Sequence, residues 1–343
     1  MKEPFLKRMK RRFTYVLRDL HERADPSWVK HPSNIQIDTH NYCNLWLNGK
    51  GCIHCNVKPS GGWNLPRGWM PTEMIRYIIE YWGEHGAKSV APYINGEPMM
   101  EFRLPWICDL CQENGMFVVV DTNGTLYKYR ERLVHPNLKE VRFSFSAATP
   151  EVYEIVHGAP LYKHARKTIE WFLKNKHENQ TARLYFITNK YNIHEIERYI
   201  KEWEGKARIT LFPLHEVPNI QLESEKSRPE PQDYWDEITK KIVGEYPKQP
   251  YRPIDIYVNG KRKIRHFPPY VACQGTYSFS ISWNGLLLHC TDIPYKYNYG
   301  YIYDHDMLEV WHKRNRMKLG HPACSVCNVK HPKHDEILRK YLF

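Results

Sequence analysis

Cysteine is the residue type that most clearly indicates chemistry in this 343-residue chain, because its nine copies fall into three groups. The groups are Cys43, Cys52 and Cys55; Cys108 and Cys111; and Cys273, Cys290, Cys324 and Cys327. An odd total fits poorly with a complete set of disulfides. Groups of three and four thiols that include CxxC pairs instead favour thiolate ligation of a metal centre.

The group of three thiols has two interpretations. A structural zinc ion takes four ligands, so this group would need a fourth, such as His40 or His54. A four-iron cluster held by three thiolates instead leaves one iron open to bind something else. The four C-terminal cysteines suit a closed site, which either zinc or a cluster would fill.

Short apolar segments alternate with amphipathic ones around the first cysteine group. Strands are expected at residues 35–39, 89–93, 116–121, 140–145, 183–188 and 207–213, and helices at 72–85, 104–113, 162–174 and 193–203. Strands that alternate with helices form βαβ units with a parallel sheet. We therefore expect an α/β fold, a partial (β/α)6 TIM-like barrel followed by a small cysteine-rich α+β module. The active face of such a barrel lies at the carboxyl ends of its strands.

The expected organisation has four segments. They are a basic N-terminal helical extension (1–33), the barrel (34–215), a proline-rich linker with one helix at 233–245 (216–270) and the cysteine-bearing module (271–343). Within that module, Asn284-Gly285 predicts a hairpin turn between strands at 277–283 and 286–290.

The composition of the chain indicates which classes of binding partner to expect. Fifty Lys and Arg against 38 Asp and Glu give a net charge of +12, which predicts attraction to acidic partners. No apolar run approaches the ~18 residues that span a membrane, and the N-terminus lacks the apolar region of a secretory signal. We expect a cytoplasmic protein with no membrane partner. Nucleic acid is compatible with the charge and the 14% aromatic residues, although no RNA-binding motif supports it.

Five features, in order, resemble radical S-adenosylmethionine (SAM) enzymes. They follow successive expected strands: Cys43…Cys52-Ile53-His54-Cys55, Asn95-Gly96-Glu97-Pro98, Thr122-Asn123-Gly124, Ser144-Phe145-Ser146 and Asn192. The resemblance covers roughly residues 33–215. The family's usual cluster spacing is CxxxCxxC, whereas eight residues separate Cys43 from Cys52 here.

The resemblance implies a [4Fe–4S] cluster on Cys43, Cys52 and Cys55, with SAM bound to the open iron. Reductive cleavage of SAM then gives a 5′-deoxyadenosyl radical that abstracts hydrogen from a substrate carbon. The implied SAM-binding residues are His54, Asn95, Gly96, Glu97, Pro98, Thr122, Asn123, Ser144, Ser146 and Asn192. Several have plainer alternatives, since turns and strand ends use the same residue types, and Asn192 is placed to cap a helix.

The C-terminal cysteines resemble the SPASM/twitch extension. Cys273 precedes a Gly285-x4-Cys290 hairpin, and Cys324 and Cys327 close the set. The resemblance implies one auxiliary [4Fe–4S] cluster, and therefore two clusters in all. A full SPASM module would carry further cysteines, and none follows Cys327.

The family resemblance leaves the substrate open. Oxidation or cross-linking of a peptide, a protein or a carbohydrate-derived small molecule is favoured, with an acidic flavodoxin or ferredoxin as electron donor. Epimerisation needs a spare thiol, and Cys108 and Cys111 share a helix face expected in the core, away from the active face. Glu216, His289 and Asp292 are candidate acid/base groups. A nucleic-acid-modifying enzyme and a zinc-stabilised scaffold remain the alternative classes.

Overall fold

The structure of the chain is a computed structural model. It describes residues 29–47, 49–55, 57, 65–214, 232–246, 253–264, 277–291, 295 and 297–317. The expected N-terminal helix lies outside these residues. So do three of the four C-terminal cysteines and two acid/base candidates: Cys273, Cys324, Cys327, Glu216 and Asp292.

A single eleven-stranded sheet runs through the described part of the chain, in the order β11-β10-β9-β1-β2-β3-β4-β5-β6-β7-β8. The central six strands pair in parallel. They are β1 (Asn34–Ile37), β2 (Ser89–Ala91), β3 (Phe117–Thr122), β4 (Leu138–Ser144), β5 (Thr181–Thr188) and β6 (Arg208–Pro213). The six strands expected from the sequence and their parallel, partial-barrel arrangement are confirmed.

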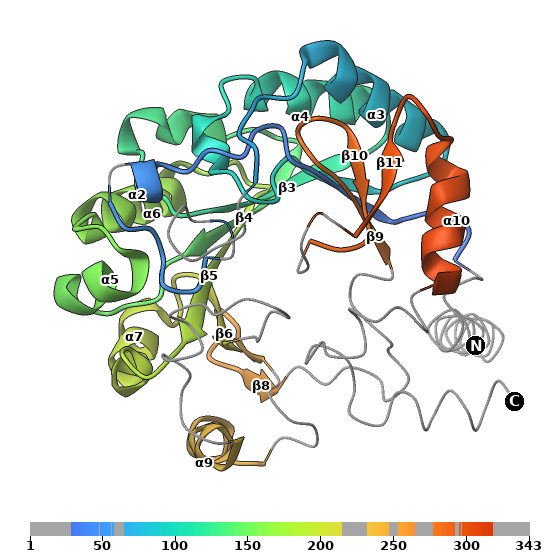
Figure 1. Ribbon diagram of the computed structural model, residues 1–343. Coiled ribbons are helices and arrows are strands. Elements are labelled where there is room, and N and C mark those ends of the chain that lie inside the picture. The colour runs from blue at the N-terminus through green and yellow to red at the C-terminus, as the bar shows by residue number, and fades with distance from the viewer. Residues whose placement is uncertain are drawn as a thin grey trace, which may run out of the picture.

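Helices cover the outer side of this curved sheet (Figure 1). The longer ones are α3 (Thr72–Glu84), α4 (Leu104–Glu113), α5 (Pro150–His157), α6 (Tyr162–Asn175), α7 (Ile196–Trp203), α9 (Gln232–Val243) and α10 (Met307–Met317). Single turns are α2 (Asn44–Leu47), η2 (Pro98–Met100) and η4 (Ile193–Glu195), and η3 (Tyr127–Leu133) is a longer 3₁₀ segment. Among the described residues, no helix has the length and apolarity needed to cross a membrane.

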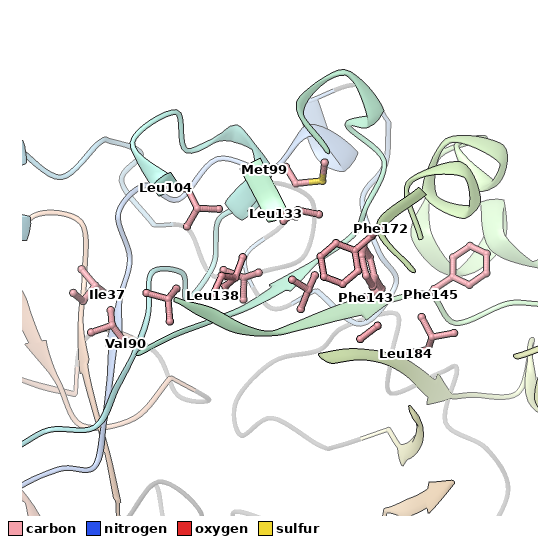
Figure 2. Close-up of a cluster of buried hydrophobic side chains, with 14 of the residues drawn as sticks. Ile37, Val90, Met99, Leu104, Leu133, Leu138, Phe143, Phe145, Phe172 and Leu184 are labelled. Carbon is pink, nitrogen blue, oxygen red and sulfur yellow. The ribbon is translucent and has the colours of Figure 1, made fainter. Parts of the chain in front are cut away.

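The main hydrophobic core lies between the strands and these helices. Val141 and Phe143 of β4 are fully buried, as are Leu104 of α4 and Phe172 of α6. The phenyl rings of Phe143 and Phe172 meet edge to face, with centroids 5.5 Å apart (Figure 2). Because successive side chains of a strand point to opposite faces, the residues between these apolar positions face the inside of the barrel.

The inner face of the sheet is charged. Arg142 of β4 pairs with Asp121 of β3, with Nε 2.8 Å from Oδ1. Arg183 of β5 pairs with Glu140 of β4 at 2.8 Å. Alternation in β4 therefore separates an apolar outer face from a polar inner face that is available to recognise polar ligands.

Short strands extend both edges of the sheet. β7 (Ile254–Ile256) and β8 (Arg262–Ile264) continue antiparallel from β6. At the other edge, β9 (Ser278–Ile281) pairs in parallel with β1, and β10 (Leu286–Leu288) and β11 (Asn298–Tyr301) follow antiparallel. The expected hairpin around Gly285 is confirmed, with a positive φ of 83° at that glycine. Its first strand joins the barrel sheet directly.

Helix α10 fastens this C-terminal hairpin to the barrel. The indole of Trp311 is fully buried and donates from Nε1 to the carbonyl oxygen of Val29 at 3.0 Å. The same ring packs edge-on against Phe279 of β9, with centroids 5.9 Å apart. One side chain thus joins α10, β9 and the segment that enters β1.

We predict that Trp311→Ala lowers the free energy of unfolding by about 3–5 kcal/mol, because it leaves a cavity and an unpaired carbonyl group. Tyr303→Ala, at a site that is 71% exposed, should cost little by comparison. Guanidinium unfolding of the anaerobically purified proteins measures both. Equal losses in the two variants would show that Trp311 does not anchor α10.

Candidate functional site

The loops that follow β1, β2 and β3 meet at the carboxyl ends of these strands. Asp38, directly after β1, accepts hydrogen bonds through Oδ1 from the backbone N–H groups of Ile94 and Asn95, at 3.3 and 3.0 Å. The backbone N–H of Glu97 donates to the carbonyl oxygen of Tyr42 at 2.9 Å. The predicted motif at 95–98 is therefore bonded directly to the loop that carries the first three cysteines.

The carboxylate of Glu97 ties the second loop to the third. It accepts hydrogen bonds from the backbone N–H groups of Met99 at 2.9 Å and Asn123 at 2.8 Å, and from the hydroxyl of Thr122. Glu97 is buried, and this burial raises the pKa of its carboxyl to about 7. Its part in holding SAM stays a prediction, whereas its part in joining these loops is direct.

Gly96 brings the two loops into backbone contact. A Cβ atom at this position would lie 2.2 Å from the carbonyl oxygen of His40 and 2.8 Å from its Nδ1. No side chain fits into such a gap. The ring of His40 itself accepts the backbone N–H of Tyr42 at Nδ1, at 3.2 Å.

Cys43 lies beside the motif that ends β3. Asn123 donates from Nδ2 to the Cys43 sulfur at 3.6 Å and to Oδ1 of Asn44 at 3.0 Å. Desolvation raises the pKa of the Cys43 thiol well above its usual range. A thiolate at this position is therefore favoured only when a cation such as an iron atom compensates its charge.

The described residues between Cys43 and Cys52, which are 44–47 and 49–51, form a folded insert. The insert begins with the single turn α2, and the backbone N–H of Gly51 bonds back to Leu45 at 3.2 Å. It then contacts the C-terminal end of α5, where Lys50 N–H donates to the carbonyl oxygen of Gly158 at 3.0 Å. The departure from the usual family spacing thus places Cys52 against α5.

Two side chains that sequence reasoning missed lie at this loop. His157, the last residue of α5, places Nδ1 3.4 Å from the Cys52 sulfur. Arg67 donates to the carbonyl oxygens of Asn41 and Val57, at 2.9 and 2.6 Å, and lies over the ring of Trp46 at 4.0 Å. Neither residue belongs to a sequence motif, so only their place in the fold identifies them.

Cys55 opens onto a cavity of about 310 Å³. The cavity is lined by Gln36, Cys55, Val57, Tyr93, Ile94, Asn95, Gly96, Asp121 and Thr291. Asn95 and Gly96 come from the second loop, and Asp121 comes from the charged inner face. The cavity therefore connects the cysteine loop to the inside of the barrel.

Tyr295, from the C-terminal part of the chain, contacts the loops that follow β1 and β2. The hydroxyl of Tyr295 donates to Oδ2 of Asp38 at 3.1 Å, and Nδ2 of Asn95 bonds to that hydroxyl. Asp38 is fully buried, which raises the pKa of its carboxyl to about 6 in spite of these hydrogen bonds. Tyr295 thus links the segment after β10 to the predicted SAM loop.

The chemistry of the three thiols fits a cluster. Among the described residues, no group of three or more His, Cys, Asp or Glu side chains forms a site for a single metal ion. The loop nevertheless supplies three thiols, with nitrogen atoms of Asn123 and His157 next to two of the sulfurs. Iron–sulfur clusters are held by thiolates and tuned by hydrogen bonds to sulfur, so this donor set suits one.

The other predicted SAM-binding residues are placed as follows. His54 meets His157 edge-on, with ring centroids 6.1 Å apart. Ser144 lies on the inner side of β4, whereas Ser146 is fully buried. Asn192 is also buried and makes no helix-capping bond, because its Oδ1 accepts the backbone N–H of Asn189 at 2.7 Å. Its Nδ2 donates to the carbonyl oxygens of Ser146 and Ile187, at 2.8 and 2.9 Å. Their contacts with SAM stay predictions.

The remaining candidates lie in the core or at its edge. Cys108 and Cys111 are fully buried in α4, between that helix and the sheet, as expected for core cysteines. His289 is buried and bonds through Nδ1 to the hydroxyl of Tyr299 at 2.7 Å. Cys290 is partly exposed at the end of the hairpin.

Comparison with known families agrees with this geometry. The Radical SAM superfamily model matches residues 41–202, and the SPASM iron–sulfur cluster-binding domain model matches residues 273–328. This chain belongs to the radical SAM superfamily. It is a radical SAM enzyme with a SPASM domain, and the two domains imply SAM and [4Fe–4S] clusters as its cofactors.

Solved structures share the fold. Streptococcus suis SuiB bound to the precursor peptide SuiA has a TM-score of 0.62 at 15% identity, over 91% of this chain and 72% of SuiB. AnSMEcpe with bound AdoMet has a TM-score of 0.55 at 15% identity, over 87% and 86%. Its complex with AdoMet and the Kp18Cys peptide gives 0.52 at 15%, over 86% of each chain. No curated protein sequence matches the chain.

We predict that Gly96→Ala weakens SAM binding by about tenfold or more, because the methyl group would force the backbone at 95–97 of the radical SAM domain away from His40. Gly115→Ala is the matched control, since Gly115 has a φ of 70° and open space around its Cβ position. The control should cost only about 1 kcal/mol in stability. Calorimetric titration of the anaerobic, cluster-loaded proteins with SAM measures the difference. Parent-like affinity in Gly96→Ala would contradict the close contact.

A second prediction concerns the buried carboxyl of Asp38. Burial raises its pKa to about 6 in the fold, from the usual 3.8 of an aspartic acid. The folded state therefore binds the proton more tightly, and folding stability falls as the pH rises between these values. Relative to Asp38→Asn, the parent should lose about 1 kcal/mol between pH 5 and pH 7. Urea unfolding at both pH values, with the exposed-site variant Glu113→Gln as control, measures this change. A constant difference across the two pH values would contradict it.

Proposed function

We propose that this radical SAM enzyme abstracts hydrogen from a carbon atom of a peptide substrate, for oxidation or cross-linking. The observation that carries the proposal is the shared cavity, in which Cys55 and the predicted SAM loop line one side and Asp121 of the charged inner face lines another. When bound, the cluster and SAM would supply the radical chemistry that removes a hydrogen atom from the substrate carbon.

The chain's own residues would bind and orient these groups. Cys43, Cys52 and Cys55 would hold the SAM-binding cluster, and the backbone at 95–97 would position SAM beside it. Asn123 keeps an N–H group directed at the Cys43 sulfur. His54 would offer its ring to the adenine base.

The C-terminal thiols would hold the second cluster. Cys290 lies at the end of the hairpin that extends the barrel sheet. We propose that it acts together with Cys273, Cys324 and Cys327. The bond between Tyr295 and Asp38 supports a close relation between this module and the SAM loop.

The inner face of the barrel suits a polar chain. Arg142 is paired with Asp121, and Arg183 with Glu140, so their charged groups are held in fixed positions. Fixed charges and hydrogen-bonding groups recognise backbone amides at little cost in ordering. Two of the structures similar to this chain, SuiB bound to SuiA and anSMEcpe with the Kp18Cys peptide, contain peptides, which supports this substrate class.

A basic pocket supports an acidic electron donor such as flavodoxin or ferredoxin. Lys163 and Arg166 of α6 and Arg198 and Lys201 of α7 line a cavity of about 670 Å³. One carboxylate, Glu202, lines it as well. Pro150, at the other end of α5 from His157, forms part of the wall. An excess of positive charge at this place would attract an acidic protein to the face formed by α6 and α7.

The proposal is tested first by 5′-deoxyadenosine formation in anaerobic, reconstituted protein given SAM and dithionite. The parent should form it, and Cys43→Ala should form none above background, because one thiolate ligand is lost. Cys108→Ala, at a core cysteine, is the matched control and should stay active. Formation by Cys43→Ala, or none by a parent with its full iron and sulfide, would refute radical initiation at this loop.

The substrate class needs a separate readout. A digest of deuterium-labelled cellular protein supplies mixed peptides as the probe. We expect deuterium to appear in the 5′-deoxyadenosine only in the presence of both peptides and active enzyme. If the enzyme cleaves SAM in the presence of the peptides but its 5′-deoxyadenosine contains no deuterium, the result would count against a peptide substrate.

A further inference from the structure

His157 makes a hydrogen bond through each ring nitrogen, and the bond at Nε2 determines which partner donates at Nδ1. Nε2 accepts the backbone N–H of Ser146 at 3.1 Å, so this nitrogen carries no proton. The ring is fully buried. An imidazole whose Nε2 is unprotonated carries its one proton on Nδ1, which lies 3.4 Å from the Cys52 sulfur.

The surroundings hold the imidazole in this orientation. Ser146 is fixed because its carbonyl oxygen accepts from Asn192 and its hydroxyl oxygen accepts from the backbone N–H of Ile187, at 2.8 and 3.0 Å. Tyr153 stacks on the imidazole ring, with centroids 4.3 Å apart and planes 28° apart. A flip of the ring would place Cε1 against the Ser146 N–H and Cδ2 against the sulfur, so both hydrogen bonds would be lost.

The cysteine loop is fixed against α5, which holds the Cys52 sulfur in place beside the His157 ring. Backbone bonds join the loop to α5 on both sides of His157, from Ile53 N–H to Val156 and from Lys50 N–H to Gly158, each at 3.0 Å. Gly158 has a φ of 71°, and a Cβ there would lie 2.2 Å from the carbonyl oxygen of Gly51. Both partners of the bond are therefore preorganised.

We propose that His157 is a positioning residue whose Nδ1–H donates permanently to the Cys52 sulfur and raises the reduction potential of the cluster held there. A donor N–H stabilises negative charge on a thiolate, and the reduced cluster carries one more negative charge than the oxidised one. The bond thus favours the reduced form. This inference rests on the proposed role of Cys52 as a cluster ligand.

The test compares two substitutions in the full, anaerobically reconstituted protein. His157→Leu removes the donor, whereas His157→Asn keeps an amide N–H near the position of Nδ1. Potentiometric titration is followed by the EPR signal that SAM alters, which belongs to the three-cysteine cluster. Tyr153→Phe, which keeps the stacked ring, is the control.

We expect His157→Leu to lower the ratio of reduced to oxidised cluster about tenfold at a fixed potential, a 59 mV shift for one electron. His157→Asn should stay within about threefold of the parent, and Tyr153→Phe should match it. A parent-like potential in His157→Leu overturns the proposal. An equal loss in the Leu and Asn variants also overturns it, because the effect would then come from packing and not from the donor.

A measurement on the parent itself covers the case in which His157→Leu does not hold its cluster. With ¹⁵N-labelled histidine, pulsed EPR of the reduced cluster should show a hyperfine coupling that disappears in His157→Asn. Its absence from the parent overturns the inference. If SAM alters no cluster signal in the parent, the proposed function fails; if SAM does so and His157 has no effect, only this inference fails.

Discussion

The buried carboxylate of Glu97 is the interaction on which the site depends. A carboxylate in a dry interior is unfavourable unless donors surround it, and Glu97 has three, from Met99, Thr122 and Asn123. Its own N–H continues the network to Tyr42 in the cysteine loop. The loops after β1, β2 and β3 are therefore held in one arrangement, and a change in any of them reaches the other two.

Asp38 has a matching role on the other side of the second loop. Its carboxylate accepts hydrogen bonds from the backbone N–H groups of Ile94 and Asn95 and from the hydroxyl of Tyr295. Because β9 pairs in parallel with β1, the C-terminal hairpin starts beside the strand that Asp38 directly follows. The SPASM part of the chain is thus joined to the predicted SAM loop by sheet pairing and by the hydrogen bond from Tyr295 to Asp38.

Much of this arrangement could be predicted from the sequence, and the misses have physical causes. The six parallel strands were recognisable because strands covered on their outer face by helices show dense apolar runs with βαβ spacing. The strands β7 and β8 were missed because three residues, such as Arg262–Ile264, carry too little pattern without their neighbours. His157 was missed because it lies 105 residues from Cys52, a contact that only the fold creates.

The spacing of the first cysteines shows how a sequence departure acquires a structural meaning. Closing a loop with a few extra residues costs well under ~1 kcal/mol, so spacing alone says little about cluster binding. The insert is closely packed, however. Gly49 and Gly158 approach so closely that a Cβ on Gly49 would lie 2.5 Å from the Gly158 carbonyl oxygen. A loop that only spanned a distance would need no such fit. The added residues place Cys52 against the end of α5, beside the ring of His157. The Cys52 sulfur there contacts Nδ1, which carries the ring proton because Nε2 accepts the hydrogen bond from Ser146.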